Sequence, residues 1–452
     1  MKRHGRIYLN SFDYTAGLLN HLCRLTPGRG NHFLVVLENR EKFHAPNIPH
    51  LTRLLAPCAA LLSGRMRRHA LNLAPYWEEK RRHAADSKIR ITFESLGEKA
   101  DFQDALSVFA NAPLPPGDHL ELKIFEKSSV SYAVFKFSHQ LFDGLGAEYL
   151  LRALNDSDES TIGETPGLAT PMLRDWTRQF RAGRQVNRKL LSIKRSGILS
   201  HPFTPLPTAA ARFRILSWTP EESAGIASLS ERKAGPFMLT AFLLSAAARS
   251  MAAVLDSHHH RRKRKTKTAD AGNALDEEKS GNLLAYMSFD MRGTEGIPQR
   301  SIFFNQWSLL PLLIPREDLN DPLPRIREEL YEANAERLPQ AFRNAAYLAR
   351  IAPYPLLETI FRSAFGKVFT GSFMFSHLPG TVLETPEFLG NGVVNLFHMP
   401  LMPPEPGVGF FFNQFHGRMN CVISCREGAL EENDLNRIVL LLKSELTGRE
   451  AL

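Results

Sequence analysis

The residues His139 to Gly144, which read His-Gln-Leu-Phe-Asp-Gly, place an imidazole four positions before a carboxylate. A neutral imidazole has an ordinary pKa of about 6.5, so it can accept a proton from a hydroxyl or an amine near pH 7. A carboxylate so close along the chain can organise the local backbone or pair with a cation. We therefore take His139 as a candidate general base and Asp143 as the residue that organises its surroundings.

The elements around this motif would carry His139 to the end of a strand. Val130 to Phe137 is almost continuously apolar, which predicts a strand buried on both faces. Residues 120–124 alternate in polarity and predict its hairpin partner. From Ala147 onward apolar residues recur at helical spacing, so Gly144 and Gly146 indicate a turn between strand and helix. A histidine at this junction can reach into a cleft.

The same spacing has simpler interpretations. A histidine and an aspartate four residues apart can form a surface pair on a helix, or the aspartate can cap a helix N-terminus. The apolar strand before the motif and the helical pattern after it favour the catalytic interpretation. Other motifs of catalysis are absent from the sequence: it has no Gly-x-Ser-x-Gly elbow, no Gly-x-x-x-x-Gly-Lys loop and no His-Glu-x-x-His. We expect no metal site.

The pattern His-x-x-x-Asp-Gly, between a strand and a helix, resembles the active-site motif of the condensation-domain and chloramphenicol-acetyltransferase-like superfamily of thioester-dependent acyltransferases. Wax ester synthases and polyketide-associated acyltransferases are similar at this point. The resemblance implies that His139 is the general base, that Asp143 and Gly144 are structural, and that no acyl-enzyme forms. Several relatives have a second histidine where this chain has Ser138. Acyl-coenzyme A or a phosphopantetheine thioester on a carrier protein would be the co-substrate, with no permanently bound cofactor.

The resemblance also implies an α/β fold of two mixed α/β sandwich lobes, arranged in a V with the active site at their interface. A chain of 452 residues is long enough for two or three domains of about 150 residues each. Polar and proline-rich segments after the motif helix predict a break in the chain. We predict an N-terminal lobe over 1–168, a linker over 169–208 and a C-terminal lobe over 209–452.

Three further positions resemble parts of the superfamily's site. Arg292 follows a predicted strand and is the expected partner of Asp143, which a bidentate guanidinium would hold in its charged form. Alternatively, Arg292 is an exposed residue at a strand end. Asn305 is a candidate oxyanion donor or a turn cap. Ser376 belongs to a segment similar to the superfamily's Ser-Asn-x-Pro-Gly stretch, with His377 where asparagine is usual.

The chain is basic, with a net charge of +9, and part of the excess lies in the run HHHRRKRKTK at 258–267. This run and the polar stretch after it predict a disordered loop over 257–280, which is either a plain surface insertion or a contact for anionic lipid, a carrier protein or nucleic acid. The apolar stretch from Pro236 to Leu255 predicts a buried amphipathic helix rather than a membrane span.

Two classes of function remain open at this point. The first is an acyltransferase that acts on a small-molecule or lipid alcohol or amine, with peripheral membrane contact but no nucleic acid. The alternative is a non-catalytic basic binding protein of the same fold that contacts nucleic acid or an anionic membrane. Four scattered cysteines and no signal-peptide pattern predict a cytoplasmic protein, with membrane association as a further expectation.

Overall fold

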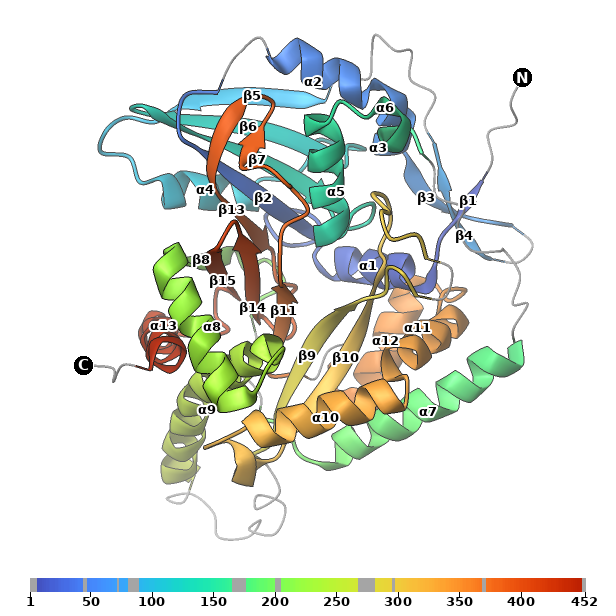
Figure 1. Ribbon diagram of the computed structural model, residues 1–452. Helices are drawn as coiled ribbons and strands as arrows, with labels where there is room; N and C mark the ends of the chain where they lie inside the picture. The colour runs from blue at the N-terminus through green and yellow to red at the C-terminus, as the bar shows by residue number, and fades with distance from the viewer. Residues whose placement is uncertain are drawn as a thin grey trace.

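The structure, a computed structural model, has two six-stranded mixed sheets with helices packed on them, and a small three-stranded sheet at one side (Figure 1). It describes residues 6–43, 47–70, 73–79, 89–164, 176–199, 205–266, 281–294, 297–367 and 371–448. Parallel and antiparallel neighbours occur in both large sheets. The predicted α/β class with two mixed lobes is confirmed.

The first lobe is built on the sheet that holds the predicted motif strand. Its order is β12 (Glu387–Phe388), β13 (Asn391–Pro400), β2 (His32–Asn39), β7 (Val130–Ser138), β6 (Leu120–Lys127) and β5 (Arg90–Ser95). The helices of this part of the chain are α1 (Ser11–Leu22), α2 (Asn47–Leu55), α3 (Ala59–Leu62), α4 (Phe102–Asn111), α5 (Gly144–Asn155) and α6 (Glu159–Ile162). The small sheet is β1 (Ile7–Tyr8), β4 (Pro75–Glu78) and β3 (Arg65–Arg68). Helix α1 lies between the two lobes (Figure 1).

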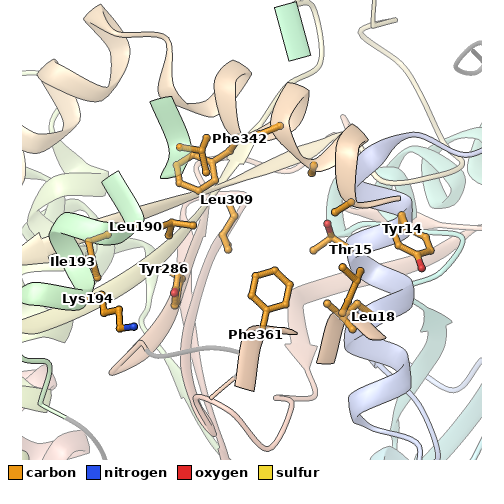
Figure 2. A pocket seen from close by; sticks show the side chains of 15 residues that line it. Tyr14, Thr15, Leu18, Leu190, Ile193, Lys194, Tyr286, Leu309, Phe342 and Phe361 are labelled. Carbon is orange, nitrogen blue, oxygen red and sulfur yellow. The ribbon is translucent and has the colours of Figure 1, made fainter. Parts of the chain in front are cut away.

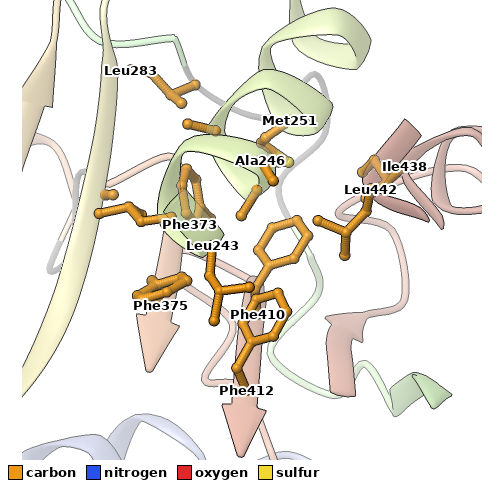
Figure 3. Close-up of a cluster of buried hydrophobic side chains, with 14 of the residues drawn as sticks. Leu243, Ala246, Met251, Leu283, Phe373, Phe375, Phe410, Phe412, Ile438 and Leu442 are labelled. Carbon is orange, nitrogen blue, oxygen red and sulfur yellow. The ribbon is translucent and has the colours of Figure 1, made fainter. Parts of the chain in front are cut away.

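The second lobe has the sheet order β10 (Trp307–Ile314), β9 (Leu283–Asp290), β11 (Phe373–Leu378), β14 (Val408–Phe415), β15 (Arg418–Arg426) and β8 (Ala211–Ser217). Its helices are α7 (Trp176–Arg195), α8 (Pro220–Ala234), α9 (Leu239–Thr266), α10 (Leu323–Ala335), α11 (Leu338–Ala349), α12 (Tyr354–Phe365) and α13 (Glu432–Thr447). Aromatic side chains from β11 and β14 interleave with aliphatic ones from α9 and α13 to form the largest core (Figure 3). Apolar burial on this scale is the main stabilising contribution to such a lobe.

The lobes do not follow the predicted division of the chain in full. Strands β12 and β13 belong to the predicted C-terminal lobe, 209–452, yet they extend the first sheet, where β13 pairs with β2. Asn395 on β13 exchanges two hydrogen bonds of 3.0 Å with Asn420 on β15 of the second sheet. Strand β13 therefore ties the two sheets together. A long-range crossover of this kind leaves no mark in local composition, which is why a division by linkers misses it.

The basic run is the second difference from the sequence-based expectation. The predicted disordered loop over 257–280 is wrong in its first part, because α9 continues through residues 258–266. Residues 267–280 lie outside the described part of the chain. Arginine and lysine have high helix propensity, so a helix that is firmly nucleated in the core can propagate into such a run.

Helix α9 also contains the segment predicted as a buried helix. Leu239–His258 is long and apolar enough to cross a membrane, but 72% of its most apolar window is buried inside the protein. Its apolar residues pack against the strands of the second sheet and against α13 (Figure 3). Core packing thus accounts for the apolar composition of this helix.

Candidate active site

His139 directly follows strand β7, whose side chains are buried on both faces as predicted. Its backbone N–H donates to the carbonyl of Asn31 at 3.0 Å, which fixes the start of the turn. Its ring packs on Phe33, with 5.0 Å between ring centroids, and faces the edge of Trp307 at 6.3 Å. The residue as a whole is half-buried.

Asn305 fixes the tautomer of the His139 ring. The amide nitrogen of Asn305 donates to the His139 carbonyl at 2.9 Å, and its Oδ1 accepts from the indole N–H of Trp307 at 2.9 Å. An indole nitrogen can only donate, so the orientation of the amide is set. The His139 Nδ1, 3.1 Å from the same Oδ1, must therefore carry the proton. This leaves Nε2 as the basic nitrogen of the ring.

The His139 ring is also kept neutral. Burial lowers the pKa of His139 below its ordinary 6.5, and this effect outweighs the opposing influence of the Asp143 carboxylate and the bond to Asn305. Removing a group from water disfavours its charged form, which for histidine is the imidazolium. Near pH 7 the Nε2 lone pair is consequently free of a proton.

Asp143 caps helix α5, which the sequence analysis gave as a simpler interpretation of the motif, and it pairs with Arg292, which the resemblance implied. The Asp143 Oδ1 accepts from the backbone N–H of Gly146 at 2.7 Å and from the guanidinium of Arg292 at 2.7 Å. Both side chains are buried, at 5% exposure for Asp143 and 1% for Arg292, so the alternative of an exposed Arg292 is wrong. The pair is not bidentate, because Oδ2 accepts the N–H of Gln306 at 2.8 Å. Asp143 thereby joins the turn after His139 to the segment that carries Asn305.

Arg292 has other partners besides Asp143. It donates to the Ser301 carbonyl and to Asp290 Oδ1, the latter at 2.9 Å. Although burial alone would lower the pKa of Arg292, the two carboxylates raise it above its ordinary value. The guanidinium is thus a permanent charge that compensates the buried Asp143 carboxylate.

Helix α5 begins at Gly144, so the two glycines form its first turn rather than a separate turn before it. A Cβ on Gly146 would stand 2.2 Å from the backbone carbonyl oxygen of Ile302. A Cβ on Gly144 would make only ordinary contacts, the nearest at 3.6 Å from His398 and Leu378. Gly146 therefore permits the close approach of the segment that leads to Asn305.

We expect the Gly146→Ala substitution to destabilise the protein by about 1–3 kcal/mol, as overpacking of a tight contact usually does. Gly144→Ala is the matched control and should be nearly neutral, because its Cβ has room. Denaturant unfolding of both variants measures the difference. Equal stability of the two would contradict the packing argument.

The sequence analysis missed Asp13, a buried residue on α1 that supports Asn305. Its Oδ1 accepts the Asn305 backbone N–H at 2.6 Å and the Asn305 side-chain amide at 3.3 Å, while Oδ2 accepts the Asn10 N–H at 2.8 Å. Burial raises the pKa of Asp13 to about 7, against the lowering effect of the N–H donors of Asn305 and Asn10. Asp13 and Asn10 together form a capping box at the start of α1, and this box is the sequence signal that could have found them.

The geometry contradicts the oxyanion role expected of Asn305, whereas the oxyanion or channel role of Ser376 stays a prediction. Both amide hydrogens of Asn305 are engaged, one by the His139 carbonyl and one by Asp13, so Asn305 has none left for an oxyanion. It orients His139 instead. Ser376 lies on β11 and accepts a hydrogen bond of 2.8 Å from Ser288. This bond joins Ser376 to Ser288, and among the described residues it does not link Ser376 to Asn305, Asp13 or Trp307, the group hydrogen-bonded around His139.

The described part of the chain holds no group of three or more histidine, cysteine, aspartate or glutamate side chains placed to bind a metal ion. The site is built from organic groups: a neutral imidazole held by an amide, supported by a buried ion pair and a second buried carboxylate. It can accept a proton from a nucleophile and return it to a leaving group.

Comparisons with known proteins bear on the fold. No protein-family model and no curated protein matches the chain. Among solved structures, the trichothecene 15-O-acetyltransferase TRI3 from Fusarium sporotrichioides superposes with a TM-score of 0.65 at 12% identity, over 98% of this chain and 94% of that chain. The first condensation domain of the calcium-dependent antibiotic synthetase, in complex with a substrate analogue, gives 0.65 at 12% identity, over 99% and 97%.

A third solved structure is TRI101 from F. sporotrichioides, complexed with coenzyme A and T-2, with a TM-score of 0.58 at 14% identity, over 95% of this chain and 96% of that chain. At these identities the likeness shows the fold. Because it spans nearly all of each chain, the two-lobe arrangement is shared as a whole.

Proposed function

We propose that this chain, which has the fold of the condensation-domain and chloramphenicol-acetyltransferase-like superfamily, is an acyltransferase that moves an acyl group from a thioester to an alcohol or an amine. The observation that carries the proposal is the state of His139. Its Nδ1 is committed to Asn305, its ring is neutral, and it stands where residues of the two lobes meet. Such an imidazole suits a general base.

The reaction then needs no nucleophile on the enzyme. The Nε2 of His139 accepts the proton of the acceptor hydroxyl or amine while the acceptor oxygen or nitrogen attacks the thioester carbonyl. The tetrahedral intermediate collapses, the carbon–sulfur bond breaks, and the imidazolium returns the proton to the departing thiolate. Base assistance of this kind is worth about 10²- to 10⁴-fold in rate. The products are an ester or an amide and a free thiol.

The donor we propose is acyl-coenzyme A or an acyl group on the phosphopantetheine of a carrier protein. Structures of the same fold with coenzyme A or with a substrate analogue of a synthetase support either source. The net charge of +9 suits both, since coenzyme A carries phosphates and carrier proteins are usually acidic. The acceptor is a small-molecule or lipid alcohol or amine.

Release of free thiol tests the proposal. The purified protein is mixed with acetyl-, octanoyl- and palmitoyl-coenzyme A, and with the matching pantetheine thioesters, in the presence of a panel of alcohols and amines. We expect thiol release that depends on both the protein and an acceptor. Release no faster than in enzyme-free mixtures, for every pair in the panel, would exclude the proposal. An acyl group covalently attached to the protein by mass spectrometry would exclude direct transfer.

The pH dependence of the rate should report His139. Because burial lowers the pKa of His139 below 6.5, the base is mainly neutral at pH 7 and becomes protonated as the pH falls. We expect kcat/KM with an alcohol acceptor to be flat from about pH 7 to 8 and to fall on an acidic limb with its midpoint below the ordinary value of about 6.5. A midpoint above that value, after correction for the enzyme-free rate, would contradict the assignment.

A further inference from the structure

An apolar cavity of about 260 Å³ is lined by side chains of α1, α7, α11, α12 and the two strands β9 and β10. Figure 2 shows Leu18, Leu190, Leu309, Phe342 and Phe361 around it. Most of its wall is hydrocarbon, and the polar side chains that line it are Tyr14, Thr15, Lys194 and Tyr286. Such a space favours an apolar ligand, because a polar group placed there would lose its hydrogen bonds to water without replacement.

The walls of the cavity continue from the residues that contact His139. Trp307 faces the His139 ring, and Leu309, which lines the cavity, lies two positions further along β10 on the same face. Phe12 packs on Trp307 with 4.9 Å between ring centroids, and Thr15, which also lines the cavity, lies one helical turn further along α1. Strand β10 and helix α1 therefore each extend from a residue near His139 to a residue that lines the cavity.

The size of the cavity bounds what it can hold. An engineered cavity of about 150 Å³ accepts benzene, with its six carbons, so by proportion this space accommodates roughly ten. Three alanines of α11 line the cavity with little side-chain volume: Ala345, Ala346 and Ala349. Larger side chains at these positions would shorten it.

We propose that this cavity holds the alkyl chain of the acyl donor and that the enzyme prefers medium-length, unbranched acyl groups of about ten carbons. This inference rests on the proposed function. The part of a thioester that lacks polar atoms is its acyl chain, whereas the pantetheine arm carries amides that would be left unpaired in such a wall. The chain begins at the carbonyl under attack, so it enters the cavity from the side of His139, past the Phe12 and Trp307 rings, which contact each other in this structure.

The test is a series of straight-chain acyl-coenzyme A donors from acetyl to palmitoyl with one acceptor. We expect kcat/KM to rise about three- to four-fold for each added methylene until the cavity is full, and to level off or fall beyond about ten carbons. In Ala346→Leu the optimum should move to shorter chains while the rate with acetyl-coenzyme A is retained. Asn344→Leu, which introduces the same side chain on the same helix at a half-buried position outside the cavity wall, is the control and should leave the optimum in place.

A second variant and a binding measurement keep the outcome decisive. Phe361→Ala, which enlarges the cavity from α12, should extend the optimum to longer chains even if Ala346→Leu does not fold. Wild-type protein should bind decanoyl-coenzyme A at least ten-fold more tightly than acetyl-coenzyme A at equilibrium, whether or not a suitable acceptor is known. Turnover without dependence on donor length, or a dependence on acceptor length instead, overturns the cavity assignment alone. Absence of thiol release with every donor overturns the proposed function. In that case the binding measurement still tests the cavity, and equal affinity for decanoyl- and acetyl-coenzyme A overturns the cavity assignment as well.

Discussion

Replacing His139 by alanine is expected to lower kcat by about 10²- to 10⁴-fold, because the acceptor would lose the group that takes its proton. The fold should survive, since His139 is half-buried and its ring is held by one hydrogen bond to Asn305 and by ring contacts with Phe33 and Trp307 rather than by an ion pair. Thiol release measures the rate, and thermal unfolding shows whether the variant remains folded. His50→Ala, which changes a histidine on helix α2 away from this site, is the control and should leave the rate unchanged.

Chemical rescue separates catalysis from structure in this experiment. Imidazole added to the His139→Ala variant can occupy the space of the lost ring and act as a base, so part of the rate should return as the imidazole concentration rises. A purely structural role for His139 would not respond in this way. A folded His139→Ala variant with the wild-type rate would remove the central assignment of this site.

The part of the site that could be predicted from the sequence is the part that is local. Val130 to Phe137 is largely apolar because both faces of β7 are buried, with Phe135 and Phe137 in one core cluster and Val134 in another, and that burial is visible in the composition. Asp143 precedes the helix that it caps by one residue. The pairing of Asp143 with Arg292 is long-range, and only the resemblance to a known superfamily suggested it.

The role of Asn305 could not be derived in this way. Its side chain is satisfied by His139, Asp13 and Trp307, and two of these partners are 166 and 292 residues away. No spacing rule connects such positions. An asparagine before a strand fits an oxyanion donor or a turn cap equally well, and only its hydrogen bonds in the structure show that it orients His139 instead.

Helices α10, α11 and α12 were missed although the sequence carries a signal for them. Each has a proline in its first turn: Pro324, Pro339 and Pro355. Proline is favoured there, since the first N–H groups of a helix have no partner within it. These helices matter for function because α11 and α12 supply much of the wall of the apolar cavity.

Replacing Arg292 by alanine should cost about 3–5 kcal/mol of stability, the usual effect of removing one partner from a buried ion pair. The Asp143 carboxylate would stay buried with only the N–H groups of Gly146 and Gln306 as partners. Denaturant unfolding of the variant measures the loss. Arg249→Ala is the matched control: Arg249 pairs with Glu445 at 2.7 Å but is 41% exposed, so its loss should cost only about 0–1 kcal/mol.

A double-mutant cycle then distinguishes the ion pair from general packing. If the cost in Arg292→Ala comes mainly from the stranded carboxylate, Arg292→Ala combined with Asp143→Asn should be less destabilised than the sum of the two single variants. Strict additivity would mean that Arg292 acts through Ser301 and Asp290 instead. Because Asp143 also holds the N–H of Gln306, next to Asn305, the single Arg292→Ala variant should lose activity as well as stability. The ion pair therefore supports the orientation of the His139 ring indirectly. Asp143 holds the N–H of Gln306, Gln306 is next to Asn305, and the side-chain amide of Asn305 holds the ring.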